Sequence, residues 1–179
     1  GPPSRKLRMH AMERLIPFLE PFGIDNEGDR MSLSFPAAVT NESIESVRQS
    51  DSPKIILFPE SRRSEKVWPH FFDLAKKISS SGLAEVVVCG NEHSPKWPGT
   101  IDLRGQIALN ELPKLVEQAT LVVSNDSAPL HLASAMNKPV IGLFGPTEHQ
   151  RYGPYPALEE LSLAISSSGA CMEGIQVDK

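Results

Sequence analysis

Short apolar runs alternate along the chain with stretches in which apolar residues recur every three or four positions. The runs lack the apolar–polar alternation of a half-exposed strand, so they are typical of strands buried on both faces of a parallel sheet. We expect strands at residues 54–58, 85–89, 100–103, 121–123, 140–144 and 161–165. Strands that alternate with helices predict an α/β fold, a parallel sheet with helices on both faces.

Helical periodicity between the runs predicts the covering helices. The clearest helix carries apolar residues from Trp68 to Ile78, and we place Pro69 in its first turn, where a missing N–H costs little. A second helix follows from the periodic residues between Leu109 and Ala119. This helix has to start near Asn110, because Pro113 would otherwise break it.

The residues before the first strand have a different character. Apolar residues between Met12 and Leu19 are loosely periodic and interrupted by prolines, which predicts a short or kinked helix packed against another element. Residues 23–52 are polar and indicate a connecting region. Within it we expect a brief strand-like piece at 31–33 and a surface helix at 41–49.

The chemistry is expected to centre on the turn that follows the strand at 121–123. We assign Asp126 as the N-cap of the next helix and place Pro129 in its first turn. The backbone N–H groups of Ser127 and Ala128 should then point outward, beyond the carboxyl end of a strand. Open α/β sheets bind anionic ligands, phosphates especially, at such a place.

The helix after this turn also carries a polar stripe. Ser127, His131 and Ser134 fall on one face, and the opposite stripe, which includes Pro129 and Leu132, is expected to face the core. An ordinary scaffold helix that tolerates a histidine at its surface is the alternative interpretation.

Two further loops leave the carboxyl ends of predicted strands and should converge on the same crevice. The loop Ser61–Lys66 carries three cations and two hydroxyl groups, and a fixed lysine such as Lys66 can neutralise charge on a phosphate. The turn Gly90–His93 holds Glu92, a carboxylate suited to ribose hydroxyls. A solvated basic loop and an ordinary polar turn are the plainer interpretations of these segments.

Composition excludes several classes of protein. The formal net charge is −4, with acidic and basic residues interspersed, so we expect no nucleic-acid partner. The two cysteines do not form a disulfide framework, and Cys89 is expected to be a buried, reduced thiol. No metal-ligand spacing, bilayer-spanning run, signal peptide, dinucleotide fingerprint, P-loop or nucleophile elbow occurs. The default is a cytoplasmic domain.

Two sequence blocks resemble the signature of glycosyltransferase family 9, the lipopolysaccharide heptosyltransferases. Residues 125–133 read NDSAPLHLA, and residues 139–147 read PVIGLFGPT. Residues 58–69 fit the family's small-residue loop followed by Lys, a spacer and Trp-Pro. Residues 8–24 resemble its interdomain linker, and residues 171–177 its carboxyl-terminal segment.

The resemblance implies one half of a GT-B architecture, in which two Rossmann-like domains face each other. Residues 1–50 would be the interdomain linker with an N-terminal helix, and residues 51–179 the nucleotide-sugar (donor) binding domain. In such enzymes the amino-terminal half binds the acceptor and supplies the catalytic base. We therefore expect that the general base is not in this chain, and that the chain alone is an incomplete enzyme.

The resemblance also implies roles for ten residues. In the loops after the first two strands, Ser61 and Arg62 would touch the donor phosphates, Lys66 would stabilise the leaving diphosphate, and Glu92 would hold the ribose. Ile107 and Ala108 would lie under the nucleobase. The pyrophosphate and the donor sugar would be bound by Asp126, Ser127, Ala128 and His131.

The implied reaction is an inverting transfer of a heptose-like sugar from a nucleoside-diphosphate sugar, an ADP-heptose-like substrate, to a lipopolysaccharide-type or other glycan acceptor. No metal and no cofactor are expected, because Lys66 and the helix N-terminus would stabilise the leaving group. The acceptor would be bound through the missing amino-terminal domain. We expect a cytoplasmic enzyme, with at most peripheral association at the inner face of the plasma membrane.

Some positions depart from the family pattern. Glu60 stands where glycine is usual, Ala108 replaces a serine cap, and Pro113 is unusual in its helix. These departures keep open a non-catalytic nucleotide-sugar-binding or interaction module with the same fold. A third interpretation, an epimerase-like GT-B protein, predicts a different set of acidic residues.

Overall fold

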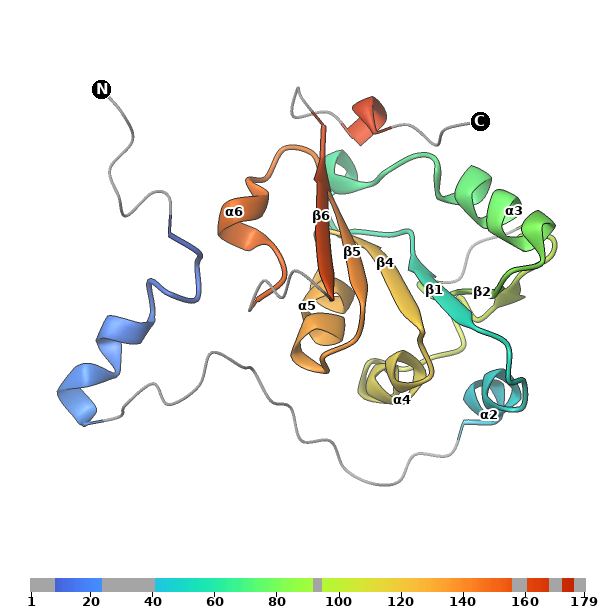
Figure 1. The fold of residues 1–179 in the computed structure, drawn as a ribbon, viewed down its shortest axis with the longest axis horizontal. Helices are drawn as coiled ribbons and strands as arrows, with labels where there is room; N and C mark the ends of the chain where they lie inside the picture. The colour runs from blue at the N-terminus through green and yellow to red at the C-terminus, as the bar shows by residue number, and fades with distance from the viewer. Residues whose placement is uncertain (1–8, 24–40, 92–94, 156–160, 168–171, 176–179) are drawn as a thin grey trace.

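Six strands form one parallel sheet in the order β3-β2-β1-β4-β5-β6. The computed structural model describes residues 9–23, 41–91, 95–155, 161–167 and 172–175 (Figure 1). The strands are β1 (Lys54–Phe58), β2 (Glu85–Val88), β3 (Ile101–Asp102), β4 (Leu121–Asn125), β5 (Val140–Phe144) and β6 (Ser162–Ser166). All six predicted strands are confirmed, with ends that differ by at most two residues.

The strand order reverses at the centre of the sheet. From β1 the chain moves outward to β2 and β3, then returns to β4 on the other side of β1 and continues to β5 and β6. The register pairs Phe58 with Ser124 and Asn125 with Leu143, so the carboxyl ends of β1, β4 and β5 lie nearly level. Such a switch point opens a crevice between the loops that leave the two central strands.

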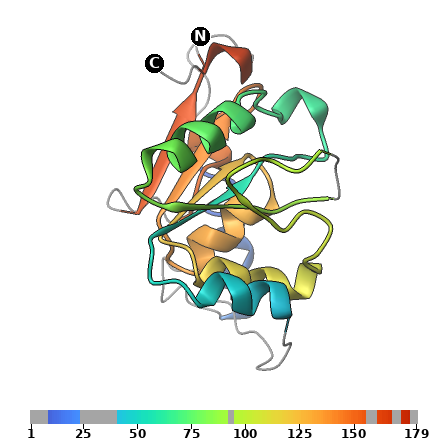
Figure 2. The same ribbon diagram turned by 90° about the vertical axis from the view of Figure 1, so that its right-hand side faces the viewer.

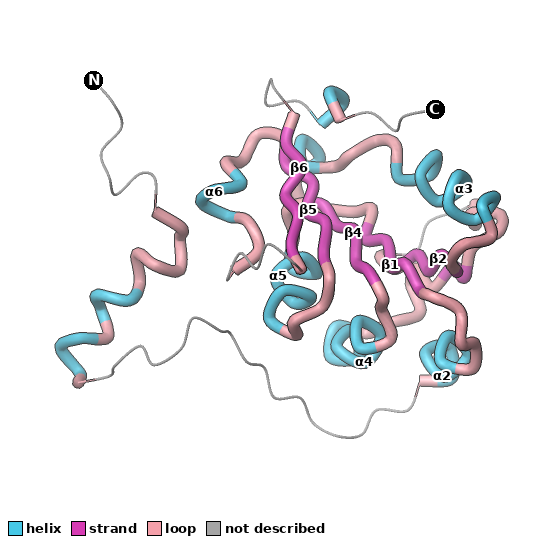
Figure 3. Tube along the Cα trace, in the orientation of Figure 1, coloured by secondary structure: helices cyan, strands magenta, loops and turns pink. Residues whose placement is uncertain are grey.

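Helices cover both faces of the sheet (Figures 2 and 3). One face packs against α2 (Glu42–Arg48), α4 (Leu112–Glu117) and α5 (Ala128–Ala135). The other packs against α3 (Phe71–Ser81) and the 3-10 turn η5 (Met172–Gly174). Short elements complete the order: η3 (Ser64–Lys66), η4 (Leu109–Glu111) and α6 (His149–Tyr152).

Alternating strand residues supply the two halves of the core. Ile56 of β1 and Val122 of β4 point into the cluster under α4 and α5, whereas Leu57 and Val123 point into the cluster under α3. All four are at most 4% exposed, as expected for central parallel strands covered on both sides. The predicted surface helix is α2, and its Val47 is completely buried in the first cluster.

The predicted starts of two helices depended on where a proline lies in the first turn. Pro113 lies in the first turn of α4, which starts at Leu112 after the turn η4, so the start predicted near Asn110 is confirmed to within two residues. The expectation that Pro69 lies inside the first turn of α3 is wrong, because that helix starts at Phe71. Trp68 nevertheless packs into the core from the preceding loop, which explains why it fits the helical period.

The longest described helix, α3, has 11 residues and is capped by Gly82, whose φ of 67° suits a residue without a Cβ atom. A membrane-spanning helix needs roughly 20 apolar residues. Across the described ranges, no helix has the length and apolar character for such a span.

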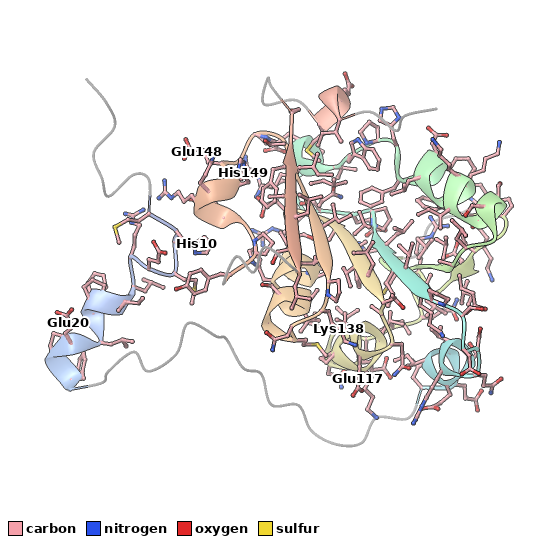
Figure 4. The ribbon with its side chains drawn as sticks, viewed as in Figure 1. His10, Glu20, Glu117, Lys138, Glu148 and His149 are labelled. Carbon is pink, nitrogen blue, oxygen red and sulfur yellow. The ribbon has the colours of Figure 1, made fainter. Side chains whose placement is uncertain are left out.

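The amino-terminal segment lies at the edge of the domain (Figures 1 and 4). Instead of the predicted short α-helix, its ordered turns are 3-10 helices, η1 (Ile16–Phe18) and η2 (Glu20–Phe22), each with a proline in the first turn. The segment contacts the domain beside α6, where the Ala11 N–H donates to the carbonyl of Arg151 (2.9 Å). The strand-like piece at 31–33 lies outside the described residues.

Candidate functional site

A buried asparagine joins the turn after β4 to the loop after β1. Asn125, the last residue of β4, is fully buried. Its Oδ1 accepts the N–H of Trp68 (3.0 Å), and its Nδ2 donates to the carbonyl of Pro59 (2.9 Å). Both ends of the loop between Pro59 and Trp68 are therefore fixed against the carboxyl end of β4.

Asp126 follows directly, and its role differs from the expected one. The N-cap of α5 is Ser127, so the assignment of Asp126 as N-cap is wrong, although Pro129 does lie in the first turn. The Asp126 carboxylate instead accepts bonds from two other elements. The backbone N–H of Asp126 donates to the carbonyl of Leu143 on β5 (3.1 Å), which continues the β4–β5 pairing by one residue.

A three-residue cluster forms on that carboxylate. Lys66 Nζ lies 2.6 Å from Asp126 Oδ2, and the Thr147 hydroxyl donates to the same oxygen at 2.6 Å. The short 3-10 turn η3 brings Lys66 to this position, and Thr147 comes from the loop after β5. The side chains of Lys66 and Asp126 are 16% and 7% exposed, so the lysine retains an opening to solvent.

These loops enclose a pocket of about 720 Å³ at the carboxyl edge of the sheet. The predicted convergence of three loops is confirmed, because the pocket is lined by residues of the β1 loop, of the β2 turn and of the β4–α5 turn. The polar lining includes Glu60, Ser61, Arg62, Arg63, Lys66, Asn91, Asp126 and Ser127. Phe58, Ile107, Leu109 and Leu112 add an apolar wall.

Most of the residues singled out from the sequence meet in this pocket. Ser61, Arg62, Lys66, Ile107, Asp126, Ser127 and Ala128 all belong to the lining. Ala108 and His131 do not belong to it, and Glu92 lies outside the described residues. Cys89 at the base of the pocket is a buried free thiol, as predicted, and burial raises its pKa to about 12.

His131 lies behind the turn, one helical turn along α5. Burial lowers the pKa of its imidazole below the ordinary value, and nearby Asp126 partly opposes the shift. The expected faces of α5 are wrong in part, since the most deeply buried residues are Leu130 and Ala133 rather than Leu132. Ser134, expected on the polar stripe, is also buried, and its hydroxyl donates to the carbonyl of Tyr155 (3.1 Å).

Ala108 has a structural position at the start of η4. Its N–H donates to the Glu111 carboxylate at 2.7 Å, and that carboxylate also accepts from Asn41 Nδ2 at 3.0 Å. The bond from the Ala108 backbone does not need the serine side chain that the family pattern suggests. The segment therefore holds neighbouring Ile107 in the pocket wall without a side-chain cap at 108.

Thr147 and Asn125 are site residues that lie within the two sequence motifs but have no role that the sequence alone predicts. Both act through bonds to loops distant in sequence, so no local period or spacing reveals their partners. The available signal was their place in the chain: Asn125 ends β4 and Thr147 lies three residues after β5, where polar residues follow an apolar run.

The sheet and its pocket define the class of protein. An open parallel α/β sheet with a polar pocket at its carboxyl edge, beside the strand-order switch, is a Rossmann-like ligand-binding domain. Within the described ranges, no three His, Cys, Asp or Glu side chains are arranged to hold a metal ion.

The family follows from comparison with known proteins. The model of glycosyltransferase family 9 (heptosyltransferase) matches residues 4–176, and the chain belongs to this family. Lipopolysaccharide heptosyltransferase 3 of Escherichia coli is 26% identical over 161 residues, which cover 82% of this chain and 47% of that protein. Lipooligosaccharide heptosyltransferase 2 of Haemophilus influenzae is 34% identical over 103 residues, which cover 50% of this chain and 30% of that protein.

Solved structures agree on the fold. A family 9 glycosyltransferase from Veillonella parvula matches with a TM-score of 0.70 at 21% identity, over 89% of this chain and 49% of that one. E. coli heptosyltransferase WaaC, solved with ADP, matches with a TM-score of 0.67 at 17% identity, over 94% of this chain and 53% of that one. The chain spans about half the length of these proteins, and its fold is one half of a GT-B architecture.

Proposed function

We propose that this chain is the donor-binding half of an inverting heptosyltransferase, which transfers a heptose-like sugar from an ADP-sugar to a lipopolysaccharide-type glycan. Family membership supports the reaction class. The related WaaC has been solved with ADP and with ADP-2-deoxy-2-fluoro heptose, which supports an adenine nucleotide sugar as the donor. A cytoplasmic site of action is part of the proposal.

The observation that carries the proposal is the fixed lysine in the pocket. One N–H of the Lys66 ammonium group donates a hydrogen bond to Asp126, and the group has three N–H donors in all. The remaining protons can bind the diphosphate, on which negative charge builds as the sugar leaves. Because Asp126 and Thr147 already hold this arrangement, the lysine needs little reorganisation during the reaction.

The amino terminus of α5 supports the same role. Ser127, Ala128 and Pro129 line the pocket at the start of this eight-residue helix. The free N–H groups and the dipole of a helix start favour a bound anion. Together with Ser61 and Arg62 on the opposite loop, they would bind the pyrophosphate from two sides without a metal ion.

The remaining residues would bind the two ends of the donor. His131, whose lowered pKa keeps its ring neutral at pH 7, would exchange hydrogen bonds with the sugar hydroxyls rather than pair with phosphate. Ile107 and Ala108 would lie under the adenine, and Glu92 would accept bonds from the ribose. The catalytic base and the acceptor site would belong to the amino-terminal half of the enzyme.

Calorimetry with ADP and ADP-heptose tests the proposal. We expect both ligands to bind, and Lys66→Ala to weaken ADP by roughly 10–150-fold, which corresponds to a charge-assisted bond of about 1.5–3 kcal/mol. Lys138→Ala is the matched control. Lys138 follows the carboxyl end of α5, away from the pocket, and its Nζ donates to the carbonyl of Glu117 on α4 (2.6 Å; Figure 4). The proposal is wrong if the unaltered protein binds neither ligand, or if the two variants behave alike.

A non-catalytic binding module remains the second candidate, because Glu60 adds a carboxylate to the pocket. This candidate predicts ADP-sugar binding without sugar transfer when the chain is joined to its acceptor-binding half. Transfer from ADP-heptose by the joined protein, lost in Lys66→Ala, would exclude it.

A further inference from the structure

Glu60 contacts the turn after β2. Its Oε2 accepts the backbone N–H of Asn91 at 2.9 Å, and the Asn91 side-chain amide donates to the same oxygen. Glu60 stands two residues after the end of β1, where the family resemblance leads us to expect glycine. Glycine at this position could accept neither bond through a side chain.

The neighbouring glycine fits closely against this carboxylate. A Cβ atom on Gly90 would lie 2.8 Å from Glu60 Oε1, so glycine at position 90 lets the carboxylate keep this place against the turn. On the other side of the turn, the Gly90 carbonyl accepts the N–H of Gly105 at 2.8 Å. Gly105 lies two residues before Ile107, which is part of the pocket wall.

Glu60 and Lys66 lie on the same loop but contact turns on opposite sides of β1. The contacts of Lys66 lead to the turn after β4, whereas those of Glu60 lead to the turn after β2 on the other side of β1. Two N–H donors of Asn91 partly compensate the negative charge of the Glu60 carboxylate. Hydrogen bonds to a charged acceptor are stronger than those between neutral groups.

We propose that Glu60 is a positioning residue, which holds Gly90 and Asn91 as the wall for the nucleoside end of the donor and does not oppose the donor phosphates. This inference rests on the proposed function, because it assigns the two ends of the donor to the two sides of the pocket. Glutamate in place of the expected glycine at position 60 would thus contribute to recognition of the donor by fixing the shape of the pocket wall.

Two substitutions separate the hydrogen bonds of Glu60 from its charge. Glu60→Ala removes both, whereas Glu60→Gln keeps an acceptor oxygen for Asn91 and removes only the charge. We expect Glu60→Ala to weaken ADP by about tenfold, the effect of losing one to two hydrogen bonds, and to leave inorganic pyrophosphate binding unchanged. Glu60→Gln should restore ADP affinity to within about threefold of the unaltered protein.

Hydrogen–deuterium exchange of the ligand-free protein gives a readout that does not depend on binding. The Asn91 amide should exchange faster in Glu60→Ala and at nearly the normal rate in Glu60→Gln. Glu117→Gln, an exposed carboxylate at the opposite end of α4 from the pocket residue Leu112, is the charge control and should change neither readout (Figure 4).

The outcomes distinguish this inference from the proposed function. If the unaltered protein binds no ADP, the proposed function is wrong. If it binds ADP but Glu60→Ala tightens ADP and pyrophosphate alike, the carboxylate faces the phosphates and the inference is overturned. Unchanged exchange at Asn91 in Glu60→Ala would also overturn it.

Discussion

Two short ion pairs at the carboxyl edge of the sheet differ in how completely the protein surrounds them. Arg104 pairs with Asp102 after β3, and Lys66 pairs with Asp126 after β4; the closest nitrogen–oxygen distance is 2.6 Å in both. The Arg104 and Asp102 side chains are 6% and 7% exposed, whereas Lys66 is 16% exposed in a pocket.

The arginine has several protein partners. Besides Asp102, it donates to the carbonyl of Pro95 (2.9 Å), and its guanidinium lies over the ring of Trp97 (5.1 Å to the centroid). Asp102 in turn accepts the N–H of Trp97, and its bonds with Arg104 hold its pKa below the ordinary value. For Lys66, Asp126 is the side-chain partner that the described contacts show. A pair enclosed by several protein groups stabilises a fold, whereas a pair that opens into a pocket can also bind a ligand.

Arg104→Ala should have the largest effect on stability. It leaves the Asp102 carboxylate without its cation, and breaking a buried pair costs about 3–5 kcal/mol. Urea denaturation should show this loss in the free energy of unfolding, and the folded fraction should keep its ADP affinity. A loss of ADP affinity without a loss of stability would reverse the contrast between the two pairs.

Asp126→Asn should cost less stability and affect binding as well. The charge-assisted bond that it weakens contributes about 1.5–3 kcal/mol, and the solvent opening at Lys66 lets water replace part of it. ADP should bind more weakly because the lysine is no longer fixed. Denaturation and calorimetry on the same preparation measure both effects; the contrast fails if Asp126→Asn is as destabilising as Arg104→Ala.

Thr147→Val isolates the hydroxyl that supports Asp126. The substitution keeps the shape of the side chain and removes one hydrogen bond to a carboxylate that keeps its bond with Lys66. The expected loss in stability is therefore about 1.5 kcal/mol, the low end for a bond to a charged group. ADP affinity should fall less than in Asp126→Asn. Thr120→Val removes a hydroxyl that accepts the Lys54 N–H (3.1 Å) just before β4, away from the pocket, and serves as the control for ADP affinity. Equal effects of the two valine variants on ADP affinity would count against a role for Thr147.

The smallest effect expected is a pH dependence from His131. Its folded-state pKa lies below the unfolded value of 6.5, chiefly through burial, so the unfolded chain binds the proton more tightly. The contribution to stability is therefore complete above pH 6.5 and is lost as pH falls through the folded pKa. His131→Gln should remove this part of the slope in denaturation curves between pH 7 and 5; an unchanged slope would contradict the assignment.

Much of the fold could be predicted because buried strands carry a continuous apolar signal. The run at 54–58 is the strand β1 as expected, and Pro113 correctly limits the start of α4. The errors occur where a residue fits a helical period without belonging to the helix, as Trp68 does. In α5 the apolar residues surround most of the helix, so the sequence does not distinguish Leu130 from Leu132 as the more buried.

The site was predictable to the level of loops. Parallel strands place their carboxyl ends at one edge, so three polar loops after predicted strands had to converge there. The partners within the site were not predictable, because Lys66 and Asp126 are 60 residues apart in sequence. Asp126 has the residue type of an N-cap, and only the position of Lys66 and Thr147 shows that its carboxylate is used otherwise.

The sequence by itself determined the class of fold, the place of the pocket and the family, since these depend on apolar runs, strand ends and short contiguous motifs. The tertiary structure decided which charges meet. It separated the enclosed pair at Arg104 from the open pair at Lys66, and it showed that Glu60 contacts Asn91. The physical reason is that an ion pair or hydrogen bond requires contact within a few ångströms, and only the packed sheet brings distant loops that close.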